Sequence, residues 1–176
     1  RQPRWKGRLG IEASDEDWFA ALVTALGEAN GLELFRSIVA SNGVSVRRGH
    51  TLLANLVASG EVPLALTVYN FTAEQLKRKG APLDWFVIAP AIARANGLAL
   101  ARAAPHPHAA LLYYDFMLGV EAQRILAERG FVPARRGLQA AALGGEALRV
   151  VDPGLVLDQA EKWTRLYESI FLAPRR

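Results

Sequence analysis

Short apolar runs of strand length alternate with segments of helical periodicity along the first eighty residues of this chain. Residues 7–12 predict a strand, and the helix that follows carries large apolar side chains at helical spacing until Gly27. Predicted strands at 44–46 and 62–68 then lie on either side of a predicted helix at 52–57. Strands separated by helices pair in parallel, because each helix returns the chain to the same end of the sheet. The alternation predicts an α/β fold with a central mixed, mostly parallel sheet flanked by helices.

The second half of the chain alternates less regularly. It predicts a helix from Thr72 to Gly80, strands at 85–88 and 97–101, and one long helix from Ala109 to about Arg129. Apolar residues cover much of the circumference of that long helix, so we expect it to be buried on more than one side.

Local signals indicate where several of these segments begin and end. Ser14 with Asp17, and Thr72 with Gln75, resemble capping boxes, in which two side chains satisfy the free N–H groups of a helix start. Asp152 followed by Pro153 predicts the start of an amphipathic helix that continues almost to the end of the chain. Residues 133–146 are rich in Ala, Gly and Arg, which is typical of a linker.

Composition and charge exclude several classes of protein. Hydrophobic residues make up 51% of the 176, enough for a buried core. The net charge is only +4 and the arginines are scattered, so we expect no nucleic-acid partner. The absence of Cys excludes disulfides, thiolate zinc sites and cysteine nucleophiles.

No apolar run is long enough to span a bilayer, and the start lacks Met and the apolar stretch of a signal peptide. We therefore expect the chain to be a processed or cut piece of a longer protein.

Three turns at the ends of predicted strands are candidate sites for a small polar ligand. The first holds Ser14 and Asp15, where a helix start offers free N–H groups and neighbouring acids favour a cation or a hydroxyl over an anion. The alternative is a plain helix cap. The second runs from Arg47 through Arg48 and His50 to Thr51, where two guanidinium groups favour a carboxylate or a phosphate. The alternative is a solvated basic turn in which His50 caps the helix.

The third turn, with Tyr69 and Asn70, follows the most apolar predicted strand, where ligands of open α/β sheets collect. Ordinary packing and capping are the alternative. Tyr113 and Tyr114 are adjacent in a helix and point in different directions, which favours core packing over a shared site. His106 and His108 have no acid nearby, so helix capping is favoured over a metal site. No catalytic motif is present in the sequence, and we expect no enzyme and no resident cofactor.

An ordered series of short motifs resembles a known family. The series comprises Trp5–Gly10, Gly49–Thr51, Gly60–Leu64, Lys79–Pro82, Ala104–Ala110, Asp115–Leu118 and Gln123. Together these motifs resemble the C-terminal portion of an extracellular solute-binding protein of an ABC importer, of the ferric-ion-binding-like branch. The likeness runs from Trp5 to Pro133 and, more loosely, through the helix that contains Trp163.

The resemblance implies a type II periplasmic-binding-protein-like lobe, one half of a two-lobed protein that closes on its ligand and delivers it to a membrane permease. It implies a ligand-binding lobe at 1–90, a crossover strand and long helix at 91–145 that pack toward an absent first lobe, and a C-terminal helix at 146–176. A periplasmic or extracellular location follows from the family. Because an isolated half would expose apolar surface, we expect the chain to self-associate or to exchange elements between copies.

The same resemblance suggests ferric iron or an iron chelate as the transported ligand. Iron binders of this branch carry two neighbouring tyrosines after the strand that corresponds to 62–68, and phenolate oxygens suit a hard cation. Here only Tyr69 lies near that position, so it is the single candidate metal ligand. The expected ligand-binding residues are Ser14, Asp15, Arg48, His50, Thr51, Tyr69 and Asn70. An organic anion, a metal chelate and a polyol would each suit them.

Two other classes of protein share this architecture. An effector-sensing domain of a transcription regulator would be accompanied by a DNA-binding helix-turn-helix, and none is visible in the sequence. A small-molecule transferase of related fold would need a general base near Arg48, for which His50 is the candidate.

Overall fold

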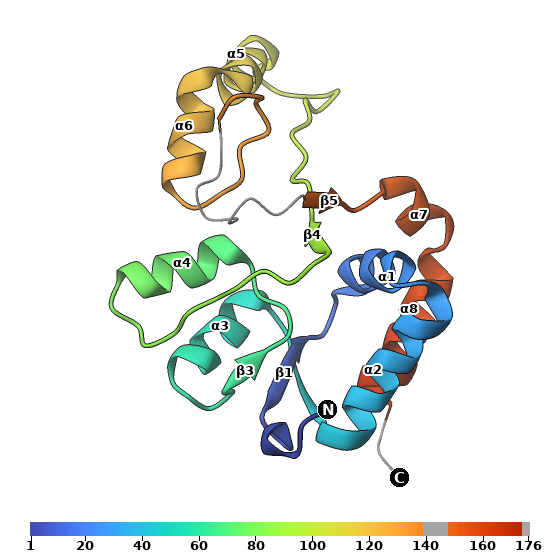
Figure 1. The fold of residues 1–176 in the computed structure, drawn as a ribbon. Helices are drawn as coiled ribbons and strands as arrows, with labels where there is room; N and C mark the ends of the chain where they lie inside the picture. The colour runs from blue at the N-terminus through green and yellow to red at the C-terminus, as the bar shows by residue number, and fades with distance from the viewer. Residues whose placement is uncertain (139–147, 174–176) are drawn as a thin grey trace. The chain divides into compact units, whose positions relative to one another are not determined.

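The chain folds into two compact units, shown in Figure 1 by a computed structural model that describes residues 1–138 and 148–173. The first unit contains residues 1–94 and 146–176, and the second contains residues 95–145. Among the described residues, no helix is long and apolar enough to cross a membrane.

A three-stranded parallel sheet organises the first unit. The central strand β1 (Leu9–Glu12) pairs with β2 (Val44–Arg47) on one side and with β3 (Leu64–Ala65) on the other. All four residues of β1 are buried, as expected for a strand covered on both faces. The structure therefore confirms the predicted α/β class and parallel pairing. The strand predicted at 62–68 is shorter than expected and ends at Ala65. It begins only at Leu64, since Pro63 has no N–H group to donate to a neighbouring strand.

Helices cover the sheet on two sides (Figure 1). On one side of β1 lie α1 (Glu16–Ala25), α2 (Glu28–Asn42) and α8 (Ala160–Tyr167). On the other side lie α3 (His50–Ala58) and α4 (Asn70–Arg78). A short 3-10 helix, η1 (Pro3–Trp5), precedes the sheet.

An aromatic cluster forms the core between α1, α2 and the C-terminal segment. Phe19 lies at its centre and contacts the rings of Phe35, Trp163, Tyr167 and Phe171, with centroids 5.2–6.1 Å apart in tilted or edge-to-face geometry. Such aromatic pairs stabilise a core beyond their buried area. Helix α1 and the segment 160–171 are therefore held together although they lie far apart in the sequence.

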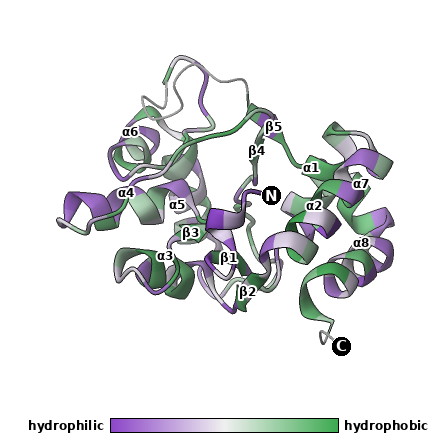
Figure 2. Ribbon diagram, turned by 60° about the horizontal axis from the view of Figure 1, so that its bottom comes forward, coloured by the Kyte–Doolittle hydropathy of each residue, from purple (hydrophilic) through white to green (hydrophobic). Residues whose placement is uncertain are grey.

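The C-terminal segment is divided into three pieces where a single helix was predicted. Asp152 caps α7 (Pro153–Asp158) as expected, since its Oδ1 accepts a hydrogen bond from the Gly154 N–H at 2.9 Å. Gln159 then leaves helical geometry, with φ −120° and ψ 21°, so α8 begins as a new helix. A π-helical turn, η3 (Glu168–Leu172), follows α8, and the turn of ribbon close to the C-terminus is coloured as hydrophobic in Figure 2.

A second, two-stranded parallel sheet lies where the chain leaves and re-enters the first unit. Strand β4 (Ala91–Ala93) pairs with β5 (Leu148–Val150), with Ala91 opposite Leu148. The strand predicted at 85–88 is absent. Trp85 instead donates through Nε1 to Glu74 of α4 at 3.2 Å, and Phe86 is exposed to solvent, so this segment runs along α4 without joining a sheet.

The second unit contains two helices where one was predicted. Gly119 is extended, with φ −70° and ψ 162°, and separates α5 (Pro107–Leu118) from α6 (Val120–Glu128). The buried amide of Gln123 stabilises this corner by donating to the Met117 carbonyl and accepting from the Ala134 N–H, both at 2.8 Å. A strand predicted at 97–101 is also absent, since its residues are exposed and pair with no other strand in the described ranges.

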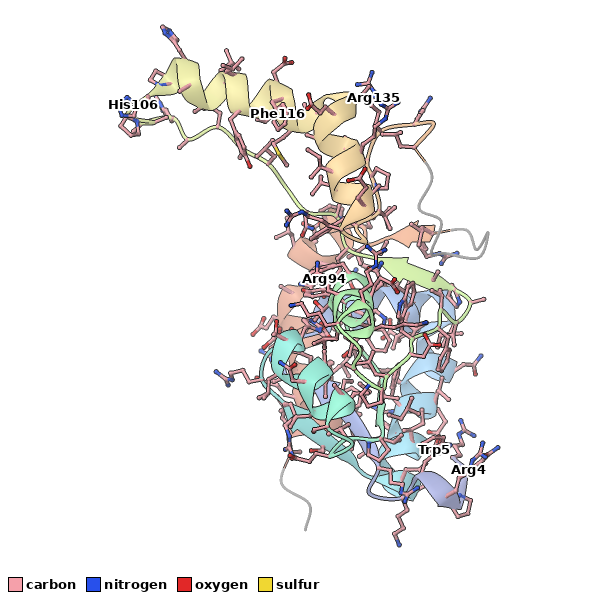
Figure 3. The ribbon with its side chains drawn as sticks, turned by 90° about the vertical axis from the view of Figure 1, so that its left-hand side faces the viewer. Arg4, Trp5, Arg94, His106, Phe116 and Arg135 are labelled. Atoms are coloured by element: carbon pink, nitrogen blue, oxygen red, sulfur yellow. The ribbon has the colours of Figure 1, made fainter. Side chains whose placement is uncertain are left out.

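The burial expected for the long helix is wrong for α5. No residue of α5 is buried, and its large apolar side chains are exposed at Leu111, Leu112, Tyr113, Phe116 and Leu118. Figure 3 labels His106 at the start of this helix and Phe116 in its second half. Of the linker-like stretch predicted at 133–146, residues 139–146 lie outside the described residues.

Both predicted capping boxes are wrong. Helix α1 begins at Glu16 with Asp15 at its N-cap, and α4 begins at Asn70, two residues before Thr72. The N–H of Ser14 is bound by Glu12, so Ser14 belongs to the turn that precedes α1. That turn lies at one end of the parallel sheet, together with the starts of α3 and α4.

Candidate functional site

The turns that follow β1 and β2 meet at the carboxyl edge of the sheet, because parallel strands end on the same side. The turn after β1 leads into α1 and carries Asp15, and the turn after β2 leads into α3 and carries His50. Tyr69 precedes α4 at the same edge, as its ring contact with His50 shows. The topology therefore gathers residues from three separate predicted turns into one place.

Glu12, the last residue of β1, joins two of these turns. Its Oε1 accepts a hydrogen bond from the Gly49 N–H at 2.8 Å, and its Oε2 accepts one from the Ser14 N–H. The residue is only 5% exposed. The sequence predicted a carboxylate or a phosphate at the turn that contains Gly49, and a cation or a hydroxyl at the turn that contains Ser14. In the structure the chain's own buried carboxylate accepts one N–H group from each turn.

Sequence reasoning missed Glu12 because it was read as the end of a strand. The available signal was an acid at the end of a buried apolar run, directly before a turn with free N–H groups. The backbone of Glu12 is fixed as well. Its N–H donates to Thr67 Oγ1 at 3.3 Å, and its carbonyl accepts from the hydroxyl of Tyr167. Burial raises the pKa of the Tyr167 hydroxyl well above its usual value, so this group remains a donor at neutral pH.

Asp15 and His50 form a buried pair beside Glu12. The Nε2 of His50 lies 3.0 Å from Oδ1 of Asp15, whose side chain is only 2% exposed. Two buried atoms of this pair, Asp15 Oδ2 and His50 Nδ1, have no hydrogen-bond partner within residues 1–138 and 148–173. Buried polar atoms are almost always paired in folded proteins, so these two unpartnered atoms make Asp15 and His50 candidate ligand residues.

Glu12, Asp15 and His50 also have the spacing of a metal site. One potential ligand atom from each residue lies within 4.8 Å of the others. Carboxylate and imidazole together suit first-row transition metals.

Tyr69 covers His50. The two ring centroids are 3.9 Å apart, and the ring of Phe71 stacks on Tyr69 at 5.3 Å. Burial raises the pKa of the Tyr69 hydroxyl, an effect that the nearby Arg94 guanidinium opposes. The hydroxyl is therefore protonated at neutral pH and becomes a phenolate only when a strong Lewis acid takes the place of its proton.

Arg94, which follows β4, is a second residue that the sequence did not reveal. Its NH1 lies 3.2 Å from Asp15 Oδ1, its Nε lies 2.7 Å from Asp17 Oδ2, and its guanidinium carbon is 5.8 Å from the centroid of the Tyr69 ring. Because 79 residues separate Arg94 from Asp15 in the chain, no local pattern could have paired them. Figure 3 labels Arg94.

A cavity of about 260 Å³ lies beside this ion pair. Its lining consists of Ser14, Glu16, Asp17, Arg94, Val156, Ala160, Trp163 and Thr164. Trp163 belongs to the aromatic core, so this cavity extends from the start of α1 to α8. It offers room for a small ligand next to the acidic side chains.

The remaining predicted site residues are placed differently. Arg48 and Thr51 are exposed at the start of α3, and the neighbouring Arg47 pairs with Glu61 at 3.4 Å. Asn70 begins α4 beside Tyr69. Tyr113 and Tyr114 lie in α5, in the second unit. The cluster at the carboxyl edge thus contains Asp15, His50 and Tyr69 of the predicted set, with Ser14 at its border and Glu12 and Arg94 added by the structure.

Comparison with known proteins gives two matches. The sequence profile of the family described as bacterial extracellular solute-binding protein matches residues 1–152. The crystal structure of iron-bound HitA from Pseudomonas aeruginosa is similar, with a TM-score of 0.64 and 23% sequence identity over 96% of this chain. The chain spans 58% of the HitA chain, and at this identity the likeness shows the fold alone. No curated protein matches the chain.

Proposed function

Because this chain belongs to the family of bacterial extracellular solute-binding proteins, we propose that it acts in the substrate-binding component of an ABC importer. In this role it captures a small solute in the periplasm or outside the cell and delivers it to a membrane permease. The first unit supplies the ligand site at the carboxyl edge of its sheet, where Asp15, His50 and Tyr69 meet. The chain binds its solute without converting it.

The buried pair of Asp15 and His50 is the observation that carries the choice of ligand. Three carboxylates, those of Glu12, Asp15 and Asp17, lie at this edge, and Arg94 is the cation that pairs with two of them. The surplus of negative charge favours a cation. Since Asp15 Oδ2 and His50 Nδ1 have no partner in the described part of the chain, they are the polar atoms that a ligand would satisfy.

The proposed cation is a metal ion, with ferric iron or an iron chelate as the first candidate. HitA, which shares the fold, was crystallised with iron bound. In this chain Asp15 and His50 would provide carboxylate and imidazole ligands, and Tyr69 would provide a phenolate oxygen once iron displaced its proton. An inorganic anion is disfavoured as the main ligand, because Glu12 already accepts one N–H group from each of the turns that precede α1 and α3.

Thermal unfolding of the 176-residue chain tests this function. Ferric nitrilotriacetate, phosphate, citrate and glucose are added separately, and a ligand at 100 times its Kd stabilises the folded state by about 2.7 kcal/mol. We expect ferric nitrilotriacetate to raise the melting temperature, and Asp15→Asn and Tyr69→Phe to reduce that rise. Asp84→Asn is the matched control, because Asp84 is an exposed ion-paired acid on the segment that follows α4.

The outcomes test the identity of the ligand separately from solute binding itself. A rise with glucose or citrate alone would overturn the metal assignment and leave solute binding in place. A rise with none of the four ligands, in a chain that unfolds cooperatively, would count against a ligand site in this chain. Recovery of the bound solute in unchanged form by mass spectrometry checks that binding is not followed by a reaction.

A further inference from the structure

Arg94 occupies the place beside Asp15 that a cationic ligand would take. Its NH1 contacts the same Asp15 oxygen, Oδ1, that His50 contacts, and its Nε contacts Asp17. Within the described residues, Arg94 is the one lysine or arginine that forms an ion pair with these two acids. The two carboxylates that would attract a metal ion are therefore partly neutralised by a cation of the chain itself.

The accessibility of the three side chains differs in a way that bears on this contact. Asp15 is almost fully buried and Asp17 is 22% exposed, whereas the Arg94 side chain is 35% exposed and also lines the cavity beside the ion pair. A buried acid has little freedom to turn away, but a partly exposed arginine can withdraw into solvent because its long side chain has many rotamers. Arg94 is therefore the partner with more freedom to move.

We propose that Arg94 is a displaceable internal cation that sets the selectivity of this site. This inference rests on the proposed function, since it concerns the same carboxylates and the same class of ligand. A metal ion that binds Asp15 through Oδ1 has to displace Arg94, so weakly charged ions are disfavoured and highly charged ions are favoured. In the ligand-free protein the same guanidinium prevents Asp15 from being buried as an unpaired charge.

The geometry distinguishes this role from that of a clamp for an anion. A guanidinium that held an anionic ligand would direct both of its parallel N–H groups toward open space. Here two of the three nitrogen atoms, Nε and NH1, already contact carboxylates. Tyr69 lies 5.8 Å from the guanidinium carbon, so an aromatic face also favours a cation at this position.

Metal titration of the intact chain and its variants tests the proposal. Arg94→Met removes the charge while keeping an unbranched side chain, Arg94→Lys keeps the charge, and Arg165→Met removes the charge of an exposed ion pair on α8 as a control. The probes are Mn²⁺, which carries no chelating anion, and ferric nitrilotriacetate. Binding is measured by isothermal titration calorimetry at two salt concentrations, and folding is followed by circular dichroism.

We expect Arg94→Met to bind Mn²⁺ about tenfold more tightly than the wild type, because a unit charge close to the metal position no longer opposes the ion. Arg94→Lys and Arg165→Met are expected to stay near the wild type. Unchanged or weaker Mn²⁺ binding by a folded Arg94→Met variant would overturn the proposal, because a purely structural ion pair would give that result.

Different results of the same titrations would overturn the proposed function and the role of Arg94. If the wild type binds ferric nitrilotriacetate but Arg94→Met shows no gain with either probe, the metal site stands and the role of Arg94 falls. If neither protein binds either metal, the metal assignment itself is overturned. Loss of ferric nitrilotriacetate binding in Arg94→Met alone would show that Arg94 holds the anionic chelator, which contradicts displacement.

Discussion

At the scale of single residues, the site depends on how each carboxylate is satisfied. Glu12 and Asp15 are both buried, but Glu12 accepts two backbone N–H groups, whereas Asp15 has one oxygen without a partner among the described residues. The first arrangement holds two turns together, and the second leaves an atom available to a ligand. Two acids three residues apart therefore have different roles, which composition alone could not distinguish.

Replacing Glu12 tests whether its carboxylate acts as an internal anion. Glu12→Ala removes a buried carboxylate that accepts the partly buried N–H groups of Ser14 and Gly49, so we expect a loss of about 1–3 kcal/mol in the free energy of unfolding. Acetate or formate should then restore part of this stability, because a small carboxylate fits the place that the side chain left. Urea unfolding with and without 100 mM acetate measures both effects.

The control for this experiment is Glu61→Ala, which removes an exposed acid that is ion-paired with Arg47. Surface ion pairs contribute little to stability, so this variant should unfold near the wild type and show no rescue by acetate. Equal responses of the two variants to acetate would show that Glu12 does not fill an anion-binding turn.

Sequence reasoning predicted some of the residues that the structure brings together in this cluster. Asp15, His50 and Tyr69 were predicted because each follows a strand, and a parallel sheet brings strand ends together. Glu12 and Arg94 were not, because the acid at the end of the first strand was assigned to the strand alone and Arg94 reaches Asp15 only through the tertiary fold. The exposed positions of Arg48 and Thr51 depend on the direction of side chains at the start of α3, which the sequence pattern does not fix.

At the scale of helices and strands, apolar periodicity predicted the elements whose apolar residues face a core. The prediction failed for segments whose apolar residues are exposed. Strand β1 and helices α1 and α3 were expected where they occur, because their apolar residues face a core. The segment at 85–88 has a strand-like composition, yet Phe86 and Ile88 are exposed and Trp85 bonds to α4. β-propensity describes a preference for a sheet surface and cannot supply the neighbouring strand.

The close approach of α1 and α2 gives a prediction at this scale. A Cβ atom at Gly31 of α2 would lie 2.7 Å from the Cα of Val23 and 2.9 Å from its carbonyl oxygen. Replacing glycine by alanine in the middle of a helix normally stabilises it by about 1 kcal/mol. For Gly31→Ala we expect the opposite sign, a loss of about 1–3 kcal/mol, because backbone atoms have to separate.

Asn30→Ala provides the comparison, since Asn30 is exposed on the same helix and the change should be neutral or slightly stabilising. Both variants are measured by thermal and urea unfolding. A Gly31→Ala protein as stable as Asn30→Ala would mean that the two helices do not approach each other this closely.

At the scale of the whole molecule, the candidate site and the hydrophobic core belong to one unit. The core cluster runs from Ile11 to Phe171, and each of its buried members lies in the first unit. The chain leaves this unit after Arg94, at the end of β4, and returns at β5. Arg94, the displaceable cation of the proposed site, is thus the last residue before the second unit. The same residue therefore takes part in ligand binding and in the path of the chain between the units.

This organisation predicts that the first unit folds and binds metal by itself. In the shortened chain, a flexible Gly/Ser linker of about 12 residues replaces residues 95–145. The core and the parallel pairing of β4 with β5 can still form, because the linker only has to span the length of three residues, from the end of β4 back to the start of β5. We expect cooperative thermal unfolding and a rise in melting temperature with ferric nitrilotriacetate that Asp15→Asn reduces. A shortened chain that unfolds cooperatively but ignores the metal, while the full chain responds, would show that the second unit contributes ligands. A shortened chain without a cooperative transition would show that the core requires the second unit.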